Sequence, residues 1–310
     1  MKLLKNTLDG FFYRHWTFLV AFSYFLKGIA RELNIAPTAF FNWHRDITIK
    51  AFKKRWQKKN SKGEIFFDIN GAVFPDFSSN KPAFYAFAFI IFDDTFLAPC
   101  FYNDNHDSSV IDKLDKHMIE GPYGYRKDSF DVTVSQNDVV IDVGAWAGDF
   151  SAYASSKGAV CYAFEPVATT FSLLNETAKL NRNIYPIQRG LGDTESEVCC
   201  FIDEDFSGTN SIFRVENPNA RSEKIRITTL DKFVEENKLE RVDFIKADIE
   251  GAERNMLKGA AQVLKKFAPK LAICTYHLPD DPEVLEKLIL DANPNYKIIH
   301  LRHKLFACVV

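Results

Sequence analysis

The sequence predicts an α/β fold with a mostly parallel sheet over the region from Asp131 to the C-terminus. Throughout this region strand-like apolar runs alternate with helical stretches, a rhythm typical of parallel α/β sheets. A glycine-rich turn follows the first apolar run, and an acidic residue ends the second. Because ligands of open α/β sheets bind outside the carboxyl ends of the strands, these two features place an expected ligand site there.

The predicted elements follow one another at short intervals. Strands are expected at Val139–Val143, Ala159–Glu165, Ile184–Gly190, Val242–Asp248 and Lys270–Tyr276. Helices are expected between them, at Gly148–Lys157, Val167–Asn181, Leu230–Asn237, Ala252–Lys266 and Pro282–Asp291. The last two apolar runs, Tyr296–Leu301 and Leu305–Val310, predict a closing hairpin.

Residues 1–130 are predicted to form a smaller subdomain of helices and a hairpin, and residues 131–310 the larger domain. The hairpin lies within Ile65–Phe77, because its Asn70-Gly71 pair is the strongest short hairpin signal in the chain. Periodicity does not decide between helix and strand for Phe84–Phe92. The expected helices are Leu3–Leu33, Pro37–Lys59 and Ser109–Ile119.

Charge is distributed unevenly along the chain. Residues 1–60 carry 12 Lys or Arg against 3 Asp or Glu, and the remaining residues 27 against 38. A basic segment can meet an anionic membrane or partner, but a solvated helix face is the favoured interpretation. The apolar run Trp16–Leu26 is too short for a membrane span. The six cysteines include no C-x-x-C pair and are interpreted as reduced core residues of a cytoplasmic protein. No nucleic-acid partner is expected, peripheral membrane contact is disfavoured, and a homo-oligomer is left open.

The glycine-rich turn after the first strand is the first candidate ligand site. Gly144 permits a tight turn with close backbone approach to a ligand, and Gly148 lets the next helix begin beside it. Alone, such a turn is weak evidence, since it is also one way for a strand to meet a helix. Glu165 strengthens the case: it ends the next strand 23 residues after Asp142, where an acid can accept hydrogen bonds from both ribose hydroxyls of an adenosyl cofactor. A helix N-terminal charge is the structural alternative.

The spacing of this turn distinguishes two cofactor classes. Proteins that bind nicotinamide dinucleotides carry the motif G-x-G-x-x-G, whereas this turn has G-x-x-x-G, with Trp146 at the position of the motif's second glycine. Bulk at this point disfavours a pyrophosphate, and S-adenosylmethionine has none. We therefore expect an S-adenosylmethionine-dependent methyltransferase, with a nicotinamide-dependent oxidoreductase or a noncatalytic binding protein with a basic N-terminal segment as the alternatives.

A second constellation ends the strand that begins at Val242. Strand alternation places Lys246, Asp248 and Glu250 on one side at its carboxyl end. Placing three charges in a cleft costs free energy, which favours a functional role for them. The alternative is a charge-paired network that serves the structure only. The functional interpretation makes Asp248 a contact to cofactor or substrate and Lys246 a fixed positive charge near an oxygen nucleophile. Glu253 falls in the next helix's first turn, where a structural role comes first.

At this point the chain resembles the FkbM family of methyltransferases. The resemblance rests on five motifs, namely VIDVGAWAGDFSAYA at 140–154, YAFEP at 162–166, TLD at 229–231, IKADIEGAE at 245–253 and TYHLPDD at 275–281. It implies a Rossmann-like class I methyltransferase fold, with seven strands of which the last is antiparallel, and O-methylation of a sugar, glycan or other small-molecule hydroxyl. Trp146 and Ala247 depart from the family pattern, where Asn and a larger aliphatic are more usual.

The resemblance also implies roles for individual residues. Asp142 and Gly144 would line the methionine part of S-adenosylmethionine together with Ala145 and Trp146, Glu165 would bind the ribose, and Gly192 and Asp193 the adenine side. The loop before the first strand would bring Tyr123 to the methionine end.

An oxygen acceptor needs a base or a metal, because an alcohol is a weak nucleophile until its proton leaves. His277 follows the fifth strand, and an unperturbed pKa near 6.5 suits this task. A His that hydrogen-bonds the adjoining turn is the alternative. Asp248 could instead take the proton or hold a divalent ion with Glu250, but no metal is predicted. The predicted catalytic residues are therefore His277, Asp248 and Lys246.

Overall fold

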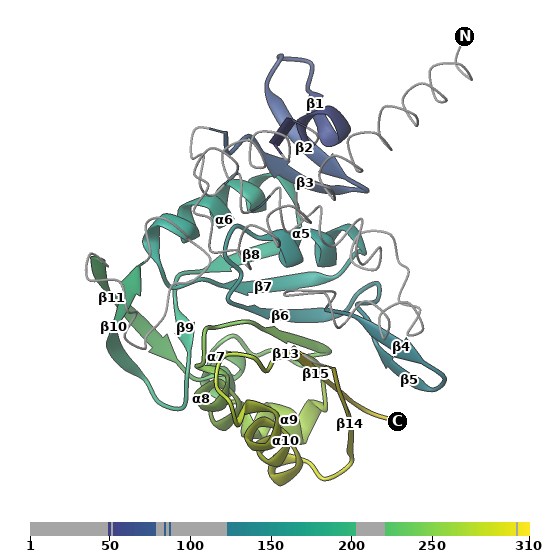
Figure 1. The fold of residues 1–310 in the computed structure, drawn as a ribbon, viewed down its shortest axis with the longest axis vertical. Helices are drawn as coiled ribbons and strands as arrows, with labels where there is room; N and C mark the ends of the chain where they lie inside the picture. Colours follow the sequence, from purple (N-terminus) through teal and green to yellow (C-terminus); the bar gives the residue numbers. More distant parts are fainter. Residues whose placement is uncertain are drawn as a thin grey trace, which may run out of the picture.

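A seven-stranded sheet runs through the centre of the computed structural model, which describes residues 49–50, 52–78, 84, 87, 123–202, 221–301 and 303–310 (Figure 1). The strands stand in the order β14-β15-β13-β12-β6-β7-β8, and β15 is antiparallel to both of its neighbours. Their bounds are β6 Val139–Val143, β7 Val160–Phe164, β8 Ile184–Ile187, β12 Phe244–Ala247, β13 Lys270–Cys274, β14 Tyr296–His300 and β15 Lys304–Val309. The predicted mostly parallel sheet, its antiparallel last strand and the closing hairpin are confirmed.

The chain reverses its direction of travel across the sheet beside β6. It passes from β6 through β7 to β8 on one side and later returns to β12 on the other side of β6. Crevices for ligands open at such a switch point, outside the carboxyl ends of the strands. The topology therefore places a site over the ends of β6, β7 and β12.

Helices cover both faces of the sheet (Figure 1). On one face lie α5 (Asp149–Ser156) and α6 (Ala168–Leu180). The other face carries α7 (Leu230–Glu236), α8 (Glu253–Lys258), α9 (Ala261–Phe267) and α10 (Asp281–Ala292). Because successive side chains of a strand point to opposite faces, the strands contribute apolar side chains to both cores. Val140 and Phe244 belong to the core cluster under α5, while Ile141 and Ile245 belong to the one under α8–α10.

Two predicted elements are each divided in the structure. The helix expected over Ala252–Lys266 is α8 and α9, separated at Gly259–Ala260. Gly259 approaches the chain so closely that a Cβ on it would lie 1.9 Å from the carbonyl oxygen of Gly192. The strand expected over Ile184–Gly190 is β8 followed by the short β9 (Gly190–Leu191).

An unpredicted hairpin stands beside β9. Its strands are β10 (Ser196–Ile202) and β11 (Arg221–Thr228), which pair antiparallel, and β11 also pairs with β9. Cys200 and Ile225 point into a small apolar cluster with Val167. Half of the residues of β11 are exposed and half are charged, which weakened the sequence signal.

The described residues between 49 and 87 pack on the α5–α6 side of the sheet. The Asn70-Gly71 hairpin is confirmed, since β2 (Ile65–Ile69) and β3 (Ala72–Pro75) pair antiparallel and both turn residues have positive φ. Asn181, at the end of α6, accepts from the amide of Val73 (3.3 Å) and donates to its carbonyl (2.6 Å). Five buried Phe rings pack against one another and share a core cluster with Phe150 of α5; they are Phe52, Phe67, Phe74, Phe84 and Phe87.

The predicted helix ending at Lys59 is wrong at its end. Residues 57–59 form β1 (Gln57–Lys59), which pairs antiparallel with β2. A second hairpin, β4 (Tyr125–Lys127) and β5 (Phe130–Val132), precedes β6, so the division at residue 130 falls inside β5 and stays a prediction. The helices expected at Leu3–Leu33 and Ser109–Ile119 lie outside the described residues. Within the described ranges, no helix combines the length and apolar character needed to cross a membrane.

Candidate active site

A pocket of about 240 Å³ opens over the carboxyl ends of β6, β7 and β12, at the switch point of the sheet. Eight of the predicted site residues line it, namely Tyr123, Gly144, Trp146, Glu165, Gly192, Asp193, Lys246 and Asp248. Residues that the sequence reasoning did not assign also line it, among them Asp149, Tyr276 and four hairpin residues, Val198, Cys200, Ile225 and Ile227. The predicted residues Asp142, Ala145 and His277 lie behind this wall.

The turn after β6 can be built only with glycine at position 144. Gly144 has φ 74°, and a Cβ on it would lie 2.0 Å from the carbonyl oxygen of Asp248. Its amide and that of Ala145 donate to the carbonyl of Phe164 on the neighbouring β7, at 3.1 and 2.9 Å. Trp146 also has positive φ, 46°, which is rare for a bulky residue. The turn is thereby held against β7 and β12 with its backbone facing the pocket.

Glu165, just after β7, is buried and connects several segments. Its Oε2 accepts from the Trp146 amide (3.1 Å), and its Oε1 accepts from the Val167 amide (3.0 Å) and the Thr170 hydroxyl (2.7 Å). Burial raises the pKa of Glu165 to about 7 against these bonds, which lower it. A carboxylate has about four acceptor positions, so these three donors leave one for a ligand hydroxyl.

Asp142 and Lys246 form a buried ion pair underneath the turn. The Lys246 ammonium lies 3.2 Å from Asp142 Oδ1 and donates to the carbonyl of Gly144 at 2.6 Å. The other Asp142 oxygen accepts from the Ser151 hydroxyl at 2.6 Å. Burial would lower the pKa of Lys246, but the nearby charges of Asp142 and Asp248 raise it above its usual value. Asp142 therefore supports the turn from behind, which differs from the predicted cofactor contact, and the ammonium of Lys246 is committed to the same turn.

Asp248 lies just beyond the end of β12 and accepts hydrogen bonds from the hydroxyl groups of two tyrosines. Tyr123 donates to its Oδ2 at 2.6 Å, and Tyr276 donates to its Oδ1 at 3.3 Å. Burial raises the pKa of Asp248, but the charges of Lys246 and His277 and the Tyr123 bond hold it below its usual value. Asp248 is therefore an ionised group on the pocket wall.

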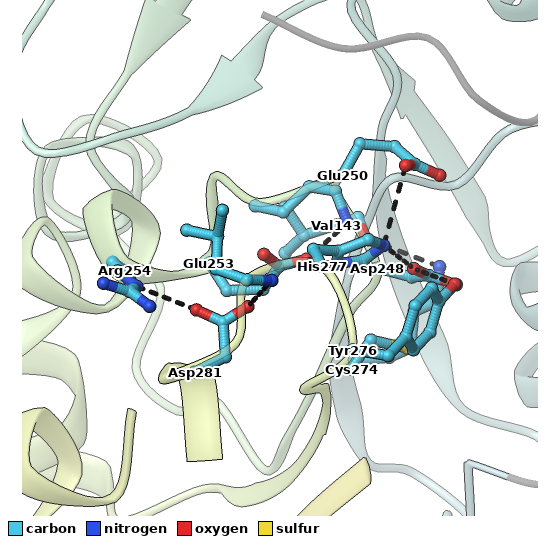
Figure 2. A network of polar contacts seen from close by, with 12 residues as sticks. Val143, Asp248, Glu250, Glu253, Arg254, Cys274, Tyr276, His277 and Asp281 are labelled. Carbon is cyan, nitrogen blue, oxygen red and sulfur yellow. Dashed lines mark hydrogen bonds and ion pairs between the residues drawn. The ribbon is translucent and has the colours of Figure 1, made fainter. Parts of the chain in front are cut away.

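His277 lies among three carboxylates, as Figure 2 shows. Its Nε2 is 3.5 Å from Asp248 Oδ1 and 3.7 Å from Glu250 Oε2, and its Nδ1 is 3.0 Å from Glu253 Oε1. Burial lowers the pKa of His277, but the contact with Glu253 and the three negative charges raise it to about 9. The expected pKa near 6.5 is therefore wrong, because the sequence does not show that three acids surround this ring.

Glu250 and Glu253 complete this cluster. Glu250 faces the pocket from a strained left-handed backbone (φ 54°), and burial raises its pKa to about 7. Glu253 is fully buried in the first turn of α8, where its Oε1 accepts from the amide of Ile249 at 2.8 Å. Strand alternation predicted that Asp248 and Glu250 face the pocket, and they do, but β12 ends at Ala247, so their positions depend on the turn that follows the strand.

Comparison with known proteins gives the following likenesses. The family model for the methyltransferase FkbM domain matches residues 142–298. A curated relative, the hexuronic acid methyltransferase AglP of Haloferax volcanii, is 26% identical over 167 residues, which cover 54% of this chain and 67% of the relative.

Two solved structures are also similar at low identity. The methyltransferase FkbM from Methylobacillus flagellatus KT is 23% identical with a TM-score of 0.47, over 78% of this chain and 62% of that one. This chain thus spans less than two thirds of that protein's length. The fibrillarin of Aeropyrum pernix, crystallised with natively bound S-adenosyl-L-methionine, is 15% identical with a TM-score of 0.36, over 57% of this chain and 68% of that one.

Proposed function

The chain belongs to the FkbM family of methyltransferases, and we propose that it transfers a methyl group from S-adenosylmethionine to a hydroxyl of a sugar, glycan or secondary metabolite. One observation carries the proposal: the Gly144 turn, Glu165 and the Asp248–Glu250 pair share one pocket at the switch point of the sheet. The name of the relative, a hexuronic acid methyltransferase, supports a sugar acceptor.

The cofactor end of the pocket fits an adenosyl group. Glu165 has one acceptor position left for a ribose hydroxyl, and Gly192 and Asp193 line the wall expected for the adenine side. Trp146 occupies the turn where a pyrophosphate would need a glycine. S-adenosylmethionine, when bound, supplies the methyl group of its sulfonium and leaves as the neutral thioether once carbon has bonded to the acceptor oxygen.

The acceptor end lies beside Asp248, Glu250 and Tyr276. Carboxylate oxygens accept hydrogen bonds from hydroxyl groups, and they are also able to take up the proton that a hydroxyl must lose. His277 lies behind Asp248 and Glu250 rather than on the wall, so we assign it to holding these two acids in place. Lys246 holds the turn through Asp142 and Gly144, which makes it a positioning residue as well.

Calorimetry with the full-length protein tests the cofactor first. S-adenosylmethionine and S-adenosylhomocysteine should bind, whereas NAD and NADH should not. Binding of the nicotinamide cofactors alone would favour an oxidoreductase and contradict the proposal.

Methyl transfer is then measured with labelled S-adenosylmethionine and a panel of hydroxylated acceptors, including hexuronates. Label on an acceptor oxygen supports the proposal. Transfer to nitrogen or carbon acceptors only would overturn its oxygen specificity, and tight cofactor binding without transfer to any acceptor in the panel or in an extract of the source cells would favour a noncatalytic protein.

A further inference from the structure

The ends of β12 and β13 bring one imidazole and two carboxylates to the same point (Figure 2). Asp248, Glu250 and His277 each present one atom able to bind a metal, and these three atoms lie within 4.8 Å of one another. Asp248 and Glu250 also line the pocket at the end that we assign to the acceptor. The cluster is therefore placed where an acceptor hydroxyl would arrive.

The imidazole is the most informative member. The His277 side chain is only 6% exposed, and its Nε2 makes no hydrogen bond to any of the described residues, although it points at Asp248 and Glu250. A buried polar atom without a hydrogen bond is costly and needs an explanation. The separations of 3.5 and 3.7 Å from Nε2 to the two carboxylates are long for hydrogen bonds. They are close to the ~3.4 Å edge between two ligands of a tetrahedral ion at the usual bond lengths.

The other ring nitrogen has a carboxylate neighbour. Glu253 Oε1 lies 3.0 Å from Nδ1 and is fixed by the Ile249 amide at 2.8 Å. Metal-binding histidines commonly have a carboxylate beside the nitrogen that does not bind the ion, and this neighbour sets the ring's orientation. The arrangement leaves Nε2, on the side of Asp248 and Glu250, as the nitrogen for an ion, which would displace the proton from it on binding.

A second grouping, Glu253, His277 and Asp281, is also close enough to hold an ion. Asp281, however, is fully buried away from the pocket, and its Oδ1 is ion-paired with Arg254 at 2.7 Å while its Oδ2 accepts from the amide of Leu278 at 2.8 Å. The positive charge of Arg254 would also repel a cation there. The donors to Asp248, in contrast, are two neutral tyrosine hydroxyls. The Asp248 side of the ring has carboxylates facing the pocket and is the better site.

We propose that Asp248, Glu250 and His277 bind a divalent transition-metal ion at the acceptor end of the pocket. A mixed set of imidazole nitrogen and carboxylate oxygen suits such an ion better than Mg²⁺ or Ca²⁺, which prefer oxygen ligands. Three protein ligands leave coordination positions open for an acceptor.

The role of this ion rests on the proposed function, although its binding does not. An acceptor hydroxyl on the ion would have a lowered pKa. Its proton would leave to water, the oxygen–carbon bond would form as the sulfur–carbon bond breaks, and the bonding pair would stay on sulfur.

Mn²⁺ titration of the chelator-treated full-length protein, followed by the electron paramagnetic resonance signal of free Mn²⁺, tests the site. We expect one ion per chain, with affinity reduced at least tenfold in Glu250→Gln and His277→Asn. Glu283→Gln, which changes an exposed acid in the first turn of α10, should bind as the wild type does. Thermal unfolding without metal shows whether each variant is folded.

Three outcomes separate this proposal from the function. No Mn²⁺ or Zn²⁺ uptake by a wild-type protein that still binds S-adenosylmethionine and transfers methyl groups would overturn the metal site alone. Unchanged Mn²⁺ affinity in both folded variants would overturn the assignment of ligands. Mn²⁺ uptake that depends on these residues, in a protein that binds no S-adenosylmethionine, would support the site while contradicting the proposed function.

Discussion

The ammonium of Lys246 lies 3.2 Å from the carboxylate of Asp142, directly underneath the turn that faces the pocket. Both side chains are almost fully buried, at 4% and 0% exposed. Lys246 also donates to the Gly144 carbonyl, so one side chain connects β12, β6 and the turn. The charge predicted for an acceptor oxygen therefore has a different task, which is to hold the cofactor turn in shape.

Removing the ammonium should destabilise the fold strongly. Lys246→Met leaves Asp142 charged and buried, and breaking a buried pair in this way costs about 3 to 5 kcal/mol of the free energy of unfolding. The double variant with Asp142→Asn should recover part of this loss. Urea denaturation measures both. Lys232→Met removes an exposed partner of Glu195, so it should cost about 1 kcal/mol or less. Equal midpoints for Lys246→Met and the wild type would contradict the pairing.

Replacing Glu165 by Ala should weaken S-adenosylmethionine binding by roughly 1.5 to 3 kcal/mol, which is the range for hydrogen bonds to a charged group. The change removes the ribose acceptor and also frees the Trp146 amide that Glu165 holds. Calorimetry gives the affinity. Glu176→Ala, at an exposed position of the neighbouring α6, should leave it unchanged. An affinity equal to that of the wild type would exclude Glu165 from the cofactor site.

Glu165 should also make the stability of the ligand-free protein depend on pH. Its pKa rises from 4.5 to about 7 on folding because the carboxyl is buried, and the nearby charge of Lys246 lowers this pKa only in part. The Cys200 thiol on the hairpin also faces Glu165, and burial raises the pKa of this thiol. Between the two pKa values of Glu165 the folded state holds a proton that the unfolded state has released. The stabilisation is therefore complete below pH 4.5 and is lost as the pH rises through 7.

Glu165→Gln isolates this effect, because Gln does not titrate. The free energy of unfolding of the wild type, minus that of the variant, should fall by on the order of 3 kcal/mol between pH 4.5 and 8. Urea denaturation across this range measures the difference. Parallel stability curves for the two proteins would show that Glu165 is ionised in the folded state throughout.

The sheet was predictable because its strands are buried on both faces. The runs at β6, β12 and β13 are apolar almost without interruption, and no other element explains such short runs between helices. The β10–β11 hairpin was missed for the opposite reason, since half of the residues of β11 are exposed and half are charged. The break between α8 and α9 depends on the approach of Gly259 to Gly192, which are 67 residues apart in the chain.

Most of the site residues predicted from the sequence line the pocket, but the sequence did not predict the charges that surround His277 and Lys246. Strand alternation predicted that Asp248 and Glu250 face one side, and both line the pocket, although β12 ends at Ala247 and Glu250 reaches the pocket from a turn with positive φ. The surroundings of His277 were not predictable, because Glu253 comes from α8 and the ring from the loop after β13. Lys246 faced the expected edge of the sheet, but its partner on the adjacent strand decided its role.

Tyr123 gives the last prediction, because it contacts the acceptor end of the pocket through Asp248. Its hydroxyl donates to Asp248 Oδ2 at 2.6 Å, while its ring lies 5.2 Å from the Lys246 ammonium and 4.4 Å from that of Lys304. Tyr123→Phe keeps the ring between the two lysines and removes only the donor, so the variant should fold normally. A hydrogen bond to a charged group contributes about 1.5 to 3 kcal/mol, and without it Asp248 is held less firmly. We expect kcat/KM for the acceptor to fall roughly tenfold or more, with cofactor affinity changed much less. Steady-state kinetics and calorimetry separate the two, and Tyr185→Phe, at a half-exposed position on β8, serves as the control. Unchanged acceptor kinetics would show that Tyr123 only packs beside Asp248, and a loss confined to cofactor affinity would place its hydroxyl at the methionine end instead.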